Sequence, residues 1–158
     1  MQIQPAKKRT DRRQSMNKKL GKGMITSCIT LILAIIGFVA YIINANTAYF
    51  SNLGKNTTVI VLLAIAIAAL IIWMTLGNVS PSWTDILPVI APACLFVGGI
   101  TLLNTRINGM AAIMTFTNNA QNMSDMSSAV VAIAAIIVAA IVGIISAFFD
   151  VKKEAETK

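Results

Sequence analysis

Long stretches without a charged residue constrain this chain more than any other feature of its sequence. No Asp, Glu, Lys or Arg occurs in residues 24–54, 56–84, 86–105 or 126–149. Only 12% of the 158 residues are charged, against about a quarter in soluble proteins. A soluble helical domain would place charged side chains along the outward face of each helix. The sequence therefore predicts an integral membrane protein.

Four apolar runs within these stretches have the length that a bilayer requires. A helix rises ~1.5 Å per residue, so about 20 apolar residues cross a hydrocarbon core ~30 Å thick. We expect the four spans at about residues 24–44, 58–76, 86–104 and 127–149. The predicted fold is all-α, an integral membrane four-helix bundle with outer loops at 45–57 and 105–126.

Basic residues are concentrated at the two ends of the chain. Eight Lys or Arg lie in residues 1–22 and three Lys in residues 151–158, whereas the opposite side of a four-span protein would hold only Lys55 and Arg106. Lys and Arg are enriched in cytoplasmic segments. We therefore predict a disordered basic cytoplasmic tail at 1–22, a membrane domain at 23–150 and a second cytoplasmic tail at 151–158, in the inner (cytoplasmic) membrane of a bacterium.

The net charge of +7 would suggest a nucleic-acid partner in a soluble chain. Here the basic residues flank a predicted span, so we expect lipid and no nucleic acid. The favoured interpretation of the basic tail is a topology signal, and the alternative is a patch for anionic lipid headgroups.

The residues that usually carry catalysis or bind metals are scarce. The chain has no His, and its two cysteines, Cys28 and Cys94, both lie inside apolar runs. A proton-coupled exporter needs an ionisable group within the membrane, and the predicted spans contain none. We therefore predict a protein that is not an enzyme, with no catalytic residue, no metal and no cofactor.

Residues 104–128 form the one long segment that is neither an apolar span nor a charged tail. Our recognition hypothesis gives this segment and the preceding outer loop a polar face with aromatic side chains, suited to a small polar ligand such as a sugar or to a protein partner. The candidate residues are Tyr49, Phe50, Arg106, Phe116, Asn118, Asn119, Gln121 and Asp125.

Two other interpretations of the same segment stay open. In the structural one, which is favoured, Arg106 pairs with Asp125, the Asn residues cap turns and Phe116 anchors in the interface. In the other, thioethers bind Cu(I). The methionines concerned are Met110, Met114, Met123 and Met126.

Small residues recur at helical spacing in the predicted spans. Ala135, Ala139, Gly143 and Ala147 lie four residues apart and share one face of the last span. Helices in lipid approach closely where such residues meet. We expect this stripe to pack inside the bundle, and a homodimer through it is the alternative.

Three segments carry a resemblance to other proteins. Residues 46–54, 85–89 and 112–120, together with Met123-Ser-Asp, resemble a group of uncharacterised small four-span membrane proteins of anaerobic Gram-positive bacteria. The resemblance implies a four-span fold and provides no activity or site residues.

Three functions are compatible with this sequence. The favoured hypothesis is a non-enzymatic membrane protein, an accessory subunit or contact protein of a larger membrane system that uses its outer loops. The alternatives are a component of an oligomeric small-solute transporter or channel, and a holin-like pore former.

Overall fold

A computed structural model of the protein describes residues 22–76 and 82–149, and these residues are helical or in short connections, with no strand among them. The elements in chain order are α2 (Lys22–Asn44), η1 (Ser51–Leu53), α3 (Thr57–Leu76), η2 (Ser82–Ile86), α4 (Leu87–Thr115) and α5 (Ala120–Ala147). The predicted tails at 1–22 and 151–158 lie outside the described residues, except for Lys22.

Each of the four long helices is long and apolar enough to cross a membrane. The candidate spans are Gly23–Asn44, Thr57–Leu76, Thr84–Thr115 and Ala120–Ala147. The predicted all-α fold with four apolar helices is therefore confirmed. Which side of a membrane the chain termini occupy stays a prediction.

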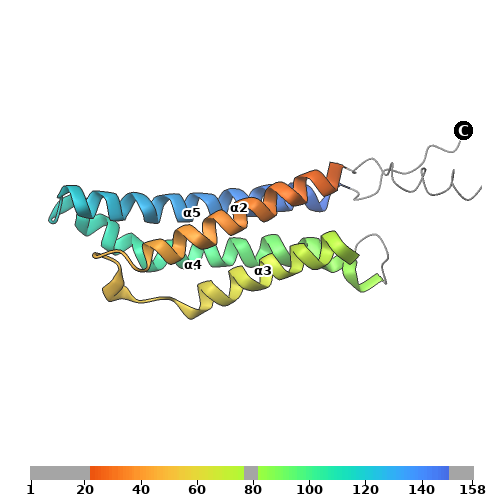
Figure 1. Ribbon diagram of the computed structural model, residues 1–158, viewed down its shortest axis with the longest axis horizontal. Coiled ribbons are helices and arrows are strands. Elements are labelled where there is room, and N and C mark those ends of the chain that lie inside the picture. Colours follow the sequence, from red (N-terminus) through yellow and green to blue (C-terminus); the bar gives the residue numbers. More distant parts are fainter. Residues whose placement is uncertain (1–21, 77–81, 150–158) are drawn as a thin grey trace, which may run out of the picture.

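The helices form an antiparallel bundle in which each helix has two neighbours. α2 packs against α5 and α3, and α4 packs against α5 and α3. The start of α2 and the end of α5 lie together at one end of the bundle, and the α4–α5 turn lies at the other (Figure 1). The first and last helices are therefore adjacent along their length.

Most of the segment 105–126, which we predicted as an outer loop, is helical. α4 continues to Thr115 and α5 begins at Ala120, so only residues 116–119 separate them. The Oδ1 atom of Asn119 accepts a hydrogen bond from the backbone N–H of Asn122 at 2.8 Å, which caps α5. Because the cap lies at Asn119, α5 begins several residues before the expected start at 127.

The predicted packing stripe on α5 is only partly inside the bundle. Ala139 and Gly143 are buried, Ala135 is half-buried and Ala147 is exposed. A Cβ atom on Gly143 would lie 3.1 Å from the Pro92 Cβ, so α4 already occupies this position. The stripe is used within one chain, which leaves its buried part unavailable for the homodimer that we considered.

Hydrogen bonds join α2 to α5 at both ends of their interface. Near the start of α2, the hydroxyls of Ser27 and Ser146 are 2.8 Å apart. At the opposite end, the side-chain N–H₂ of Asn44 donates to the Asp125 carbonyl oxygen at 3.1 Å and to the Ser128 hydroxyl at 2.9 Å. Polar side chains that pair across an apolar helix interface fix the register of the two helices.

The α2–α5 interface predicts a clear difference between two glycines. A Cβ on Gly37 would lie 2.6 Å from Ile136 Cγ1 and 3.2 Å from the Ile136 backbone nitrogen, whereas a Cβ on Gly98 would meet nothing closer than 3.6 Å. Gly37→Ala should lower the free energy of unfolding by about 1–3 kcal/mol through overpacking. The measurement is thermal or denaturant unfolding of the full chain in detergent.

Gly98→Ala is the matched control, because it makes the same chemical change in a helix that has room for it. It should be neutral or stabilise the protein by up to about 1 kcal/mol, the helix preference for Ala over Gly. Equal destabilisation by both substitutions would contradict close packing at Gly37.

Candidate functional site

The connection between α2 and α3, which we name the η1 segment (residues 45–56), folds over the sides of α4 and α5. Its far end is held by Tyr41 of α2, whose hydroxyl accepts a hydrogen bond from the Asn56 N–H at 2.6 Å. The Oδ1 atom of Asn56 in turn accepts from the Thr58 N–H at 2.9 Å, at the start of α3. Tyr41 is fully buried and joins α2 to the end of the η1 segment.

Arg106 of α4 holds the middle of the η1 segment. Its side chain is only 2% exposed and donates hydrogen bonds to the carbonyl oxygens of Phe50 at 3.4 Å and Gly54 at 3.2 Å. The guanidinium also lies 5.1 Å from the centre of the Phe50 ring, in cation–π geometry. Buried carbonyl groups need donors, and Arg106 provides them.

Asp125 of α5 holds the same segment from another side. Its Oδ2 atom accepts a hydrogen bond from the Tyr49 backbone N–H at 2.9 Å, and its Oδ1 atom accepts from the Gln121 side chain at 2.8 Å. The residue is 3% exposed. Both carboxylate oxygens of this buried side chain therefore have a hydrogen-bond partner.

Arg106 and Asp125 therefore act on neighbouring residues of one segment without pairing with each other. Within the described part of the chain, Arg106 donates only to carbonyl oxygens of the η1 segment, and the Asp125 carboxylate accepts from Tyr49 and Gln121. The ion pair of our structural interpretation is wrong. The broader idea, that both residues hold the connections in place, agrees with this geometry.

The structure divides the residues of the recognition hypothesis into two groups. Arg106, Asp125 and Phe50 are buried, so they do not form the exposed polar face that we expected. Phe116, at 87% exposed, lies with Asn118 and Asn119 on the surface of the α4–α5 turn. Gln121 is exposed and Tyr49 is half-buried.

The methionines of the copper interpretation are also divided. Met110 and Met126 pack against the buried cluster of Phe50, Ile113 and Ala129. Met114 is 65% exposed and Met123 36%. Two of the four side chains are thus half-buried and two are exposed, so the four methionines do not form one exposed group. Within the described residues, no group of three or more His, Cys, Asp or Glu could hold a metal ion.

Two important residues of this site were not singled out in the sequence. Asn44 is fully buried and joins α2 to α5. The sequence held a signal for this role, because a polar Asn directly follows the apolar run of α2. Gly109 lets two aromatic rings approach α4, since a Cβ there would lie 2.9 Å from Phe50 Cε1 and 3.3 Å from Tyr49 Cε1. Nothing in the sequence indicates the second role, because it depends on how the η1 segment folds.

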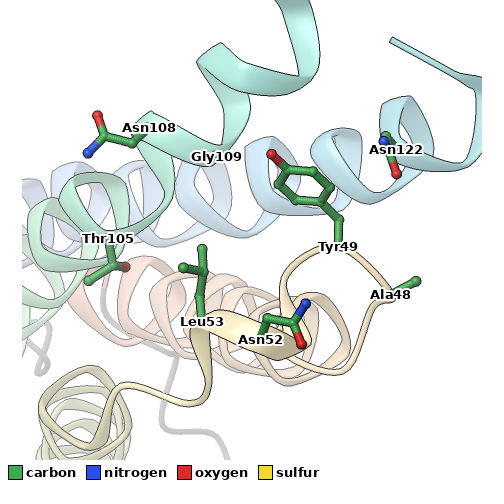
Figure 2. Close-up of a pocket in the computed structure, with 8 residues that line it drawn as sticks. All are labelled: Ala48, Tyr49, Asn52, Leu53, Thr105, Asn108, Gly109 and Asn122. Atoms are coloured by element: carbon green, nitrogen blue, oxygen red, sulfur yellow. The ribbon is translucent and has the colours of Figure 1, made fainter. Parts of the chain in front are cut away.

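A cavity of about 490 Å³, widely open to the surface, lies between the η1 segment, α4 and the first turn of α5. Figure 2 shows the Tyr49 ring and the Leu53 side chain projecting from the η1 segment toward α4, with Asn108 and Asn122 on either side of Gly109 in that view. The lining residues are Ala48, Tyr49, Asn52, Leu53, Thr105, Asn108, Gly109 and Asn122.

The fold and this site define a class of protein, an all-helical bundle of four membrane-length helices with a closely held connection at one end. Comparisons with protein-family models, with curated proteins and with solved structures gave no match. The resemblance to small Gram-positive membrane proteins therefore stays a prediction.

The role of Asp125 predicts a local change in hydrogen exchange. Asp125→Ala removes the acceptor of the Tyr49 N–H, and a hydrogen bond to a charged group contributes about 1.5–3 kcal/mol. The Tyr49 amide should therefore exchange roughly 10- to 100-fold faster. Amide exchange in detergent, followed by mass spectrometry or NMR, measures this change.

Ser127→Ala is the control, because Ser127 is an exposed residue of the same helix whose hydroxyl bonds only to the Met123 carbonyl oxygen. It should leave the η1 segment unchanged. If Asp125→Ala also leaves the Tyr49 amide protected, the carboxylate does not hold that segment.

Proposed function

We propose that the protein is a non-enzymatic, multi-pass protein of a bacterial cytoplasmic membrane, with both tails in the cytoplasm. Its role is that of an accessory subunit that contacts another membrane protein through the α4–α5 turn, which from here on includes the two helix ends beside it and covers residues 114–121. The single observation that carries this proposal is the composition of that turn. All eight of its residues are exposed, none is charged, and Phe116 is 87% exposed.

The length of α4 supports a turn that extends beyond the bilayer. Its 29 residues correspond to about 43 Å of helix, against a hydrocarbon core ~30 Å thick. Arg106 lies about 20 residues into α4, where a hydrophobic span of ordinary length would end. The residues that follow it therefore have the length to reach the membrane surface and to extend past it.

The composition of the turn is unusual for a surface in water but typical of a protein contact. Interfaces between proteins are enriched in aromatic residues and Met, and their cores are depleted of charge. The turn combines Met114 and Phe116 with the amides of Asn118 and Asn119. This mixture of apolar side chains and amides suits a protein partner better than bulk solvent.

The packing inside the bundle argues against transport of a solute through a single copy of the chain. Apolar side chains fill the middle of the bundle from all four helices, among them Ala34, Leu63, Leu95 and Ile136, each fully buried. The buried charges Arg106 and Asp125 are hydrogen-bonded to the η1 segment. Among the described residues, no continuous polar path through the middle of the bundle is therefore evident, and of these two buried charged groups only the Nε atom of Arg106 lacks a hydrogen-bond partner.

The proposed orientation predicts which end reacts with a membrane-impermeant maleimide. Asn118→Cys should be labelled in intact cells, in a chain whose own cysteines are replaced (Cys28→Ala and Cys94→Ala). Asp85→Cys, an exposed position in η2 directly before the start of α4 and so at the end of α4 opposite the α4–α5 turn, should be labelled only after the cells are opened. The reverse pattern would overturn the orientation.

The proposed contact predicts site-specific cross-linking in cells. A photoreactive benzoyl-phenylalanine in place of Phe116 should give one discrete adduct with another membrane protein, because this side chain would lie in the contact. The matched control is Phe148, which is 84% exposed at the opposite end of the bundle. It should give no adduct of the same mass.

The mass of the adduct decides between partners. A product at twice the mass of this protein would identify a second copy and would replace the accessory-subunit proposal. Cross-linking to lipid alone at Phe116 would show that the turn rests on the membrane, and it would refute a protein contact.

A further inference from the structure

The cavity beside Tyr49 has the size of a site for a small ligand. Its volume of about 490 Å³ lies within the range of roughly 300–1,000 Å³ that is common for ligand pockets. Three separate parts of the chain form it: the η1 segment, the last third of α4 and the start of α5. Because Arg106 and Asp125 hold the η1 segment in place, the walls of the cavity are fixed relative to one another.

Polar groups in the cavity are uncharged, and several have no partner within the protein. Among the described residues, the Tyr49 hydroxyl and the side-chain amides of Asn52 and Asn108 make no intramolecular hydrogen bond. Each amide provides both donors and acceptors. Asn122 is only partly used, since its N–H₂ donates to the Thr117 carbonyl oxygen at 2.8 Å while its side-chain oxygen has no partner.

An apolar surface lies beside these amides. The Tyr49 ring is half-buried and packs edge-to-face against Phe50, with ring centres 5.2 Å apart. This contact fixes the ring orientation, and Gly109 leaves the room for both rings. The 56%-exposed Leu53 side chain adds a second apolar wall.

We propose that this cavity binds a neutral sugar unit. Sugar hydroxyls both donate and accept hydrogen bonds, which the amides of Asn52, Asn108 and Asn122 can complement, and the C–H face of a sugar ring packs on an aromatic ring such as Tyr49. No Lys, Arg, Asp or Glu lines the cavity, so a phosphate, a carboxylate or an ammonium group has no countercharge there. The sugar is either part of a free oligosaccharide or the headgroup of a glycolipid.

The chain offers its own internal control for a binding experiment. It contains two tyrosines, Tyr49 in the cavity and the fully buried Tyr41. Fluorotyrosine labelling of the full chain in nanodiscs therefore gives two ¹⁹F resonances. In phosphatidylcholine nanodiscs, maltose and chitobiose test a free saccharide, and nanodiscs that contain digalactosyldiacylglycerol test a glycolipid headgroup.

Binding should shift the Tyr49 resonance saturably in at least one of these arms and leave the Tyr41 resonance in place. A response to the disaccharides identifies a free saccharide as ligand, and a response only to the glycolipid identifies a headgroup. Asn52→Ala and Asn108→Ala should each weaken the response roughly three- to tenfold, as expected for one lost hydrogen bond. Asn118→Ala, an exposed amide outside the cavity, should leave it unchanged.

The proposal is overturned if the Tyr49 resonance does not move in either arm, or if Tyr41 and Tyr49 shift together. It is also overturned if the Asn52→Ala/Asn108→Ala double variant responds as the wild type does. Neither result bears on cross-linking at Phe116, which lies outside the cavity, so failure of this site and failure of the partner contact are distinguishable.

Discussion

A connection between two apolar helices must find partners for its own peptide groups, and the bundle depends on how the η1 segment does so. Two carbonyl oxygens of that segment, Phe50 and Gly54, accept from Arg106, and the Tyr49 N–H donates to Asp125. Burial of a charge is costly unless it is hydrogen-bonded. The two ionisable residues lose contact with water and gain hydrogen bonds that hold the η1 segment against α4 and α5. The cavity beside Tyr49 depends on this placement, because the η1 segment forms one of its walls.

The middle of the bundle is held by close apolar packing, whereas its end is held by hydrogen bonds. Between the hydroxyls near Ser146 and the amide of Asn44, α2 and α5 meet through small and apolar side chains, with Gly37 directly against Ile136. In lipid, such close approach contributes through dispersion, because there is no hydrophobic gain from hiding apolar surface. Large apolar side chains that do not fit this interface, such as Ile32 and Ile36, face outward.

The sequence was a good guide to the four helices because length and hydropathy depend on each residue alone. It was less precise about the helix ends near residues 105–126, where the backbone is helical up to Thr115 and again from Ala120. It singled out Arg106 and Asp125, but the recognition hypothesis placed them on an exposed face, whereas both side chains are buried. Burial of a charged side chain depends on which backbone groups fold over it, and the η1 segment that covers them is more than 50 residues away in the chain.

The adjacency of α2 and α5 has a consequence for how the protein is made. Helices enter a membrane before they associate. Among the described residues, the earliest helix in the chain, α2, has its principal neighbour in the latest one, α5. Until α5 is inserted, Asn44 lacks the Asp125 and Ser128 groups that it contacts in the folded chain, and Asp125 has not yet reached the Tyr49 N–H. Incomplete chains therefore leave the Asn44 amide and the Tyr49 N–H without the partners that they have in the folded protein, a chemical difference between an unfinished chain and a finished one.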